Sequence, residues 1–400
     1  FHMNSVVRQM WEQNTDVVMV DTGNSYEGLC EYVGGKYISY TDEHPITMNP
    51  FAIKREELNI EKIGFLKNLI MLIWKGTQGE VTKTEDRLVE QVITEYFDEY
   101  FVKKRIDNLS FNTFYEYSTV RIPTIIKENN LAGIDLAAYN YLLKDFYKGG
   151  SHELTLNENL DTKLFDETFI VFEIDSIKDD PLLFPLVTLI IMDVFIQKMR
   201  IKKNRKVLVI EEAWKAIASP MMAEYIKYLY KTARKFWASV GVVTQEIQDI
   251  VGSPIVKEAI INNSDVVMLL DQAKFRERFD EIKAILGLTD VDCKKIFTIN
   301  RLENKEGRSF FREVFIRRGS VGAVFGVEEP HECYMTYTTE RAEKEALKLY
   351  KKELQCDHQH AIEAYCRDWE LSGISKSLPF AQKVNQTGHV LHLTPHNQSE

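Results

Sequence analysis

The hydrophobic pattern of the chain changes twice along its length. Short apolar runs, typical of buried strands, occur near the start at 16–21 and 37–40, and similar runs return from residue 168 onward. Between about residues 55 and 150 the apolar positions instead recur every three or four residues, and the stretch 87–101 carries one wide apolar stripe. We therefore predict an α/β core that is interrupted by an all-helical insertion.

Apolar runs in the second half of the chain alternate with helical stretches. The runs at 168–175, 206–211, 239–245 and 265–271 predict strands, and the stretches at 182–200 and 222–237 predict helices. Such alternation favours a mainly parallel sheet with helices on both faces. Further along, two apolar segments flank Gly319 and Ser320, which predicts a two-residue hairpin.

These patterns divide the chain into four parts. Residues 1–54 begin the core, 55–160 form the helical insertion, 161–338 complete the core and end in the hairpin, and 339–400 hold a charged helix and a polar tail. The tail shows no apolar period from about residue 376 onward. We expect it to be poorly ordered or to dock on another chain.

Composition narrows the class of protein. The formal net charge of -10 argues against a general nucleic-acid coat, although a narrow basic pore inside an acidic ring stays open. The five cysteines form no CxxC pair, so we expect reduced thiols and no zinc site, even at the Cys/His cluster 356–360. The longest apolar stretch, 182–199, contains Pro185, Asp193 and Lys198 and is shorter than the roughly 20 residues of a membrane-spanning helix. We expect a cytoplasmic protein that reaches the inner membrane only through partners.

The clearest candidate for chemistry is the segment 206–217, KVLVIEEAWKAI. A run that reads as a buried strand ends on two adjacent carboxylates, Glu211 and Glu212. Functional groups gather at the carboxyl ends of parallel strands, and a cation or a reacting water relieves the repulsion of two like charges. We predict that one carboxylate holds Mg²⁺, directly or through water, while the other activates water for attack on a phosphoryl group. Two solvated acids at a strand end stay the alternative.

Two other strand ends carry polar groups that fit the same site. A later strand ends on Thr244 and Gln245, and the Gln245 amide can orient an attacking water or sense a γ-phosphate. A helix cap at Thr244 is the structural alternative. Asp21 ends an earlier strand in the segment DTGNS, where Gly23 and Asn24 fit a turn with positive φ. Asp21 is therefore a second acidic group of the site or a turn-capping aspartate.

The phosphate-binding part of such a site is missing from the sequence. A P-loop needs the pattern GxxxxGK[ST], whose backbone N–H groups and lysine hold the phosphates, and no such string occurs in the 400 residues. A P-loop would stand directly before the helix that opens at residue 1. We expect that the sequence begins just after this loop and that these residues alone are inactive or weakly active.

Several segments together resemble a known family. They are FHMNSVVRQ, VDTGNSYEGLCE, FIVFEIDSIKDDPLLF, VLVIEEAWKAI, VVTQEIQDI and SPIVKEAIINNSDVVMLLDQ, and the similarity covers most of residues 1–340. On these motifs the chain resembles the C-terminal ATPase domain of TraG-type conjugation proteins, relatives of the VirB-class ATPases of type IV secretion in the HerA/FtsK group. The resemblance implies a RecA-like P-loop NTPase core that binds ATP and Mg²⁺. It also implies a homo-hexameric motor that energises a conjugative DNA-transfer channel together with other secretion components, including the inner-membrane complex.

The resemblance also implies roles for single residues. Glu211 takes the metal-side position of the Walker B motif, Glu212 the position of the catalytic base, and Gln245 that of the strand-tip sensor. Arg234 is a candidate arginine finger that reaches the γ-phosphate of a neighbouring subunit. Its rivals for this role are Arg308, Arg312, Arg317 and Arg318. Two other functions stay open, an assembly scaffold whose conformation nucleotide sets and a DNA translocase similar to FtsK, and so does direct contact with DNA.

Overall fold

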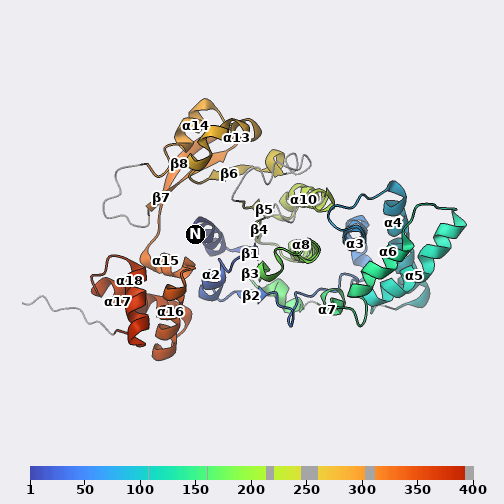
Figure 1. The fold of residues 1–400 in the computed structure, drawn as a ribbon, viewed down its shortest axis with the longest axis horizontal. Coiled ribbons are helices and arrows are strands. Elements are labelled where there is room, and N and C mark those ends of the chain that lie inside the picture. Colours follow the sequence, from blue (N-terminus) through green and yellow to red (C-terminus); the bar gives the residue numbers. More distant parts are fainter. Residues whose placement is uncertain (107, 160, 213–219, 245–259, 302–310, 392–400) are drawn as a thin grey trace, which may run out of the picture. The chain divides into compact units, whose positions relative to one another are not determined.

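The computed structural model describes the chain except for residues 107, 160, 213–219, 245–259, 302–310 and 392–400 (Figure 1). The described residues form two compact units. Residues 14–23 and 36–260 form one of them, which we call the sheet unit; residues 1–13, 24–35 and 261–400 form the other, which we call the hairpin unit. The start of the chain therefore contributes its first strand to the sheet unit and its first two helices to the hairpin unit.

A five-stranded parallel sheet organises the sheet unit. Its strand order is β2-β3-β1-β4-β5, with β2 at Lys36–Ser39, β3 at Phe169–Glu173, β1 at Thr15–Asp21, β4 at Arg205–Ile210 and β5 at Ala238–Val242. Every residue of β1 and β3 is buried, as the continuous apolar runs predict for central strands. All neighbouring pairs are parallel, so the five carboxyl ends lie at one edge of the sheet. The structure confirms the predicted parallel core.

Helices α8 (Leu183–Ile201) and α10 (Pro220–Ala233) lie beside this sheet (Figure 1). Apolar residues of both helices form one core cluster with sheet residues such as Val20 and Ile210. Two of the three charged residues in α8, Asp193 and Lys198, are buried as well. Asp193 pairs with Lys62 at 2.8 Å, and Lys198 pairs with Asp16 at 2.8 Å. The charges are therefore tolerated in the core because each has a partner.

Helices alone fill the described part of the insertion. After β2 come α3 (Ile60–Lys75), α4 (Lys83–Phe97), α5 (Phe111–Glu128), α6 (Leu136–Leu143) and α7 (Glu153–Asn157), with a π-helical turn at Asp98–Lys104. Helix α4 begins with a capping box, in which Thr82 and Glu85 each accept from the other's backbone N–H. The ring of Phe51 stacks on that of Phe114 at 4.8 Å between centroids, and both residues belong to the core cluster of the sheet. The predicted helical insertion is confirmed, and it shares one hydrophobic core with the sheet.

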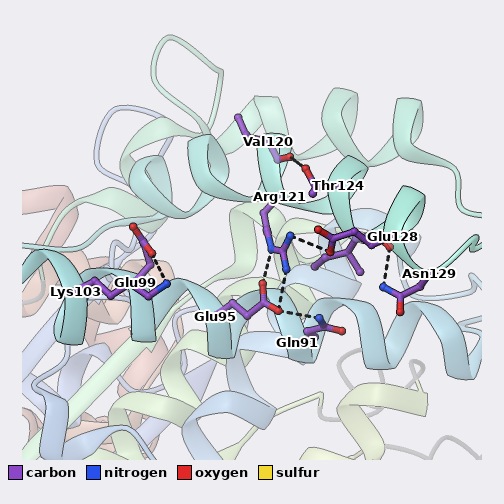
Figure 2. A network of polar contacts seen from close by, with 10 residues as sticks. Gln91, Glu95, Glu99, Lys103, Val120, Arg121, Thr124, Glu128 and Asn129 are labelled. Carbon is purple, nitrogen blue, oxygen red and sulfur yellow. Dashed lines mark hydrogen bonds and ion pairs between the residues drawn. The ribbon is translucent and has the colours of Figure 1, made fainter.

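A polar network joins α4 to α5 (Figure 2). The Arg121 guanidinium donates from Nε to Glu95 at 2.5 Å and from Nη1 to Glu128 at 3.2 Å, while Gln91 donates to Glu95 at 2.8 Å. The hydrogen bond from Arg121 holds the pKa of the Glu95 carboxyl below its usual value. The Arg121 and Glu95 side chains are 28% and 30% exposed, so water weakens their attraction.

Replacing Arg121 by methionine should reduce the free energy of unfolding by at most about 1 kcal/mol at neutral pH. The reason is that the partly exposed hydrogen bonds from its guanidinium to Glu95 and Glu128 are lost. The lowered pKa of Glu95 means that this contribution is present above the unfolded-state pKa, near 4.3, and is lost as pH falls through the folded-state pKa. Denaturation at about pH 7 and about pH 3 measures the difference between wild type and variant. Arg87→Met, which removes a guanidinium that is 75% exposed, is the control. Equal losses for Arg121→Met at both pH values would contradict the assignment.

The hairpin unit contains a three-stranded antiparallel sheet. Its order is β6-β7-β8, with β6 at Val266–Leu269, β7 at Phe311–Arg318 and β8 at Val321–Glu328. Gly319, at φ 59°, and Ser320 connect β7 to β8, as the sequence predicts. Strand β6 differs from the expectation, because it pairs antiparallel with β7 and is not a strand of the five-stranded parallel sheet. Alternation along the sequence does not reveal which strand a given run pairs with.

The other regular elements among the described residues of the hairpin unit are helices. They are α1 (His2–Glu12), α2 (Glu27–Tyr32), α13 (Phe279–Leu286), α14 (Asp290–Ile296), α15 (His331–Tyr337), α16 (Arg341–Leu354), α17 (His358–Leu371) and α18 (Ser377–Thr387). In the described part of the chain, no helix combines the length and hydropathy that a membrane crossing needs. Asp357 caps α17 by accepting the His360 N–H at 2.9 Å. The Cys/His cluster at 356–360 thus marks the beginning of a helix.

The expectation of an unstructured polar tail is wrong for residues 377–387. These residues form α18, which buries Phe380, Ala381 and Val384 in a cluster with apolar residues of α16 and α17. Three apolar positions spaced i, i+1 and i+4 give a helix a narrow face to bury. The polar residues around them hide this spacing from a search for longer apolar stripes.

Candidate functional site

Three strands bring carboxylates to one edge and one face of the parallel sheet. Asp21 is the register partner of Glu173 between β1 and β3. The Glu211 N–H donates to the Val20 carbonyl at 3.0 Å, which continues the ladder between β4 and β1. Side chains alternate between the faces of a sheet, and Val20 and Ile210, one residue earlier, belong to the core cluster formed with α8 and α10. Asp21, Glu173 and Glu211 are therefore on the face away from that cluster.

These acids differ in burial. Asp21 is 0% exposed and Glu173 is 3% exposed, while Glu211 and Glu212 are half-buried. Buried carboxylates on adjacent strands repel one another, and a cation stabilises their charged forms. Among the described residues, no group of three or more acids, histidines and cysteines has the arrangement of a complete metal cage. Mg²⁺ does not need one, because it is usually held by one or two carboxylates together with waters and phosphate oxygens. The donor set fits Mg²⁺ in that mode.

Glu212 has an unusual backbone. Its φ is 49°, in the left-handed region, which costs a residue with a Cβ roughly 1–2 kcal/mol. Such strain persists where the surrounding structure imposes it, and it occurs frequently at functional sites. This conformation ends the extended backbone of β4 directly after Glu211. It distinguishes this pair from two acids at an ordinary strand end.

The turn after β1 has the predicted conformation. Gly23 has φ 116° and Asn24 has φ 55°, both in the positive range that the sequence indicates. Asp21 stands immediately before this turn, as the last residue of its strand. The structure thus brings Asp21 to the same sheet edge as Glu211 and Glu212.

Glu173 is the residue that sequence reasoning missed. It is the last residue of β3 and lies beside Asp21. The signal was present, because the run 168–175 passes from apolar residues to an acid, as the run 206–211 does. Its importance depends on β3 being the neighbour of β1, which the sequence does not reveal.

The structure does not bring Arg234 to the carboxylates within one chain. Arg234 is exposed and lies just before β5, close to the start of β4, where the Lys206 N–H bonds the Trp237 carbonyl. From Lys206 to Glu211 is about 16 Å along an extended strand. Within one chain, Arg234 therefore lies towards the opposite end of β4 from the carboxylates, and its role as an arginine finger stays a prediction.

The other predicted site residues lie outside the described residues or in the hairpin unit. Gln245 and Arg308 lie outside the described residues. Arg312, Arg317 and Arg318 lie on β7 of the hairpin unit. Arg312 donates to the Phe311 carbonyl at 2.8 Å, and Arg317 donates to the Gly287 carbonyl at 3.0 Å. The identity of the arginine finger stays a prediction.

Comparisons with known proteins agree on the fold. TraC of Escherichia coli K12 is 24% identical over 294 residues, which cover 69% of this chain and 31% of TraC, so the chain spans about a third of that protein's length. VirB4 of Thermoanaerobacter pseudethanolicus superposes with a TM-score of 0.59 at 19% identity, covering 82% of this chain and 86% of that one. The bacterial conjugative coupling protein TrwB superposes with a TM-score of 0.52 at 12% identity, covering 82% and 81%. TrwB in complex with ADP and Mg²⁺ gives 0.50 at 12% identity, covering 82% and 80%. The fold is that of the RecA-like P-loop ATPases.

The match to a protein family extends over nearly the whole chain. The family described as the TraG P-loop domain matches residues 1–369. This range contains the parallel sheet, the helical insertion and all the carboxylates at the sheet edge. The chain belongs to the family of the TraG P-loop domain.

Proposed function

We propose that this chain is the C-terminal ATPase part of a motor that energises a conjugative type IV secretion system. The observation that carries the proposal is the Glu211-Glu212 pair after β4, with Glu212 at positive φ and buried Asp21 on the adjacent strand, in a chain of the TraG P-loop domain family. The neighbouring structure of TrwB with ADP and Mg²⁺ supports ATP and Mg²⁺ as the cofactors.

Each residue has a distinct part in the proposed reaction. Glu211, with Asp21 beside it, holds Mg²⁺ directly or through water, and the ion supplies charge neutralisation on the nucleotide phosphates. Glu212 accepts a proton from the attacking water. Gln245, which follows the next strand in the sequence, orients that water, and Arg234 stabilises the transferring phosphoryl group from a neighbouring subunit.

Assembly follows from the same proposal. Arg234 lies near the start of β4, and β4 runs about 16 Å from Lys206 to Glu211, so we infer that a complete site takes its Arg234 from a second subunit. We propose a homo-hexamer that associates with other secretion components and is held at the inner membrane through them. No GxxxxGK[ST] pattern occurs in the 400 residues.

Mg²⁺-dependent ATP hydrolysis tests the proposal. It is measured on these 400 residues and on the full-length natural protein, with and without DNA. We expect turnover only in the full-length protein, abolished by EDTA and restored by Mg²⁺. Turnover that rises with DNA length would favour an FtsK-like translocase instead. Nucleotide binding without turnover would favour an assembly scaffold.

A further inference from the structure

Glu173 joins three elements of the sheet unit through one buried carboxylate. Its Oε1 accepts from the backbone N–H groups of Gly23 at 3.3 Å and Asp175 at 2.8 Å, and its Oε2 accepts from the Tyr37 hydroxyl at 3.3 Å. The donors belong to the turn after β1, the turn after β3 and strand β2. The Glu173 carboxyl group thus bridges the turns that follow β1 and β3.

The contact to Gly23 fixes the turn that follows Asp21. Gly23 has φ 116°, a conformation that residues with a Cβ rarely adopt. The Ile174 N–H also donates to the Asp21 carbonyl at 3.0 Å. Two groups of β3 and its following turn therefore hold the chain on both sides of Thr22. Together they determine how Asp21 is presented at the sheet edge.

A buried acid is costly at the end of an apolar strand. The sequence of β3 is FIVFE, and its four apolar residues are each at most 1% exposed. An apolar residue at position 173 would avoid the cost of burying a charge. An acid there is accounted for by the three donors that it gathers, two of which are backbone groups of the turns flanking Asp21 and Glu173.

We propose that Glu173 is a positioning residue for ATP hydrolysis, holding the turn after β1 so that Asp21 stands beside Glu211 at the metal position. This inference rests on the proposed function, because it assigns Asp21 and Glu211 to Mg²⁺. Glu173 itself need not touch the ion or the nucleotide. Glu173 acts indirectly: it accepts from the Gly23 N–H, and this contact fixes the direction of the Asp21 side chain.

The test compares Glu173→Ala with Glu173→Gln in the full-length protein. Glu173→Ala removes both acceptor oxygens, and we expect kcat to fall about ten- to a hundredfold, as a small misplacement of a catalytic group does. The Kd for Mg²⁺, measured by calorimetric titration of the protein with a non-hydrolysable ATP analogue bound, should rise, while KM for ATP changes little. Glu173→Gln keeps an amide oxygen for Gly23 and Asp175, so it should recover most of the rate and the wild-type Mg²⁺ dependence.

A second pair of variants tests the pathway through the turn. Gly23→Ala strains the same turn from its other side and should give the same Mg²⁺ phenotype. The double variant Gly23→Ala with Glu173→Ala should be no worse than either single variant, because both disrupt one contact. Val171→Ala, on the same strand and face as Glu173 but remote from the turn, controls for lost stability and should leave the Mg²⁺ dependence unchanged.

The outcomes separate this inference from the proposed function. Unchanged kcat and Mg²⁺ dependence in Glu173→Ala, while Glu212→Gln is inactive, would overturn the positioning role alone. An additive double variant, or an altered Mg²⁺ dependence in Val171→Ala, would also overturn it. Full activity of Asp21→Asn alongside a defective Glu173→Ala would show that Glu173 acts by another route. Full activity of Glu212→Gln would instead refute the base assigned in the proposed function.

Discussion

The Glu212→Gln variant of the full-length protein is expected to bind ATP normally and to lose nearly all turnover. Glutamine has the shape of glutamate, but its amide cannot accept a proton from the attacking water. General base catalysis typically contributes a factor of about 10²–10⁴ to a rate, so kcat should fall by at least about a hundredfold. ATP hydrolysis under saturating nucleotide and a binding titration on the same protein measure both quantities. A large loss of kcat with little change in nucleotide affinity is the signature of an interaction made in the transition state.

Asp166→Asn provides the matched control for this variant. Asp166 also belongs to the sheet unit, but it precedes β3 and its side chain is 79% exposed in a surface pair with Lys202. The same chemical change there should leave turnover unaltered. If Glu212→Gln turned over at a near-native rate, Glu212 would not be the base. The same assay on Glu211→Gln would then show whether the neighbouring carboxylate has that role.

The sequence predicts the parallel core well because of how its strands are buried. Strands β1 and β4 lie at the centre of the sheet, so their sequences are continuous apolar runs that end where the chain reaches the polar edge. The acids that follow, Asp21, Glu211 and Glu212, are therefore visible in the sequence alone. The helical insertion is equally visible, because its period of three to four residues persists over several helices.

Features that depend on contacts between distant segments could not be predicted. Strand order places β3 against β1, about 150 positions away in the chain, and only this pairing shows that Glu173 contacts Gly23. The same limit applies to β6, whose partner β7 makes it antiparallel. The apolar pattern does not reveal helix α18, for a different reason: the helix buries only three apolar residues.

Lys198 is another residue whose role the sequence hides. In the sequence it interrupts an apolar stretch, yet in the structure its side chain is 0% exposed. Its ammonium group has three protons and three acceptors: Asp16 at 2.8 Å, the Phe165 carbonyl at 2.9 Å and the Glu167 carbonyl at 2.6 Å. Asp16 is the second residue of β1, and Phe165 and Glu167 precede β3. One buried charge thus ties α8 to the amino ends of two adjacent strands.

Replacing Lys198 by methionine should therefore destabilise the sheet unit by about 3–5 kcal/mol. Methionine fills most of the space, but the Asp16 carboxylate is left buried without its counter-charge and two carbonyls lose their donor. Hydrogen exchange of the β1 and β4 amides reports the loss for this unit alone, which matters in a chain of two units. Lys202→Met breaks the exposed pair with Asp166 at the end of the same helix and should cost at most about 1 kcal/mol. Adding Asp16→Asn to Lys198→Met should recover part of the loss, because it removes the unpaired charge. A loss as small as that of Lys202→Met would mean that Asn204, which donates to the Asp16 carboxylate at 2.6 Å, and not Lys198, is the main stabilising partner of Asp16.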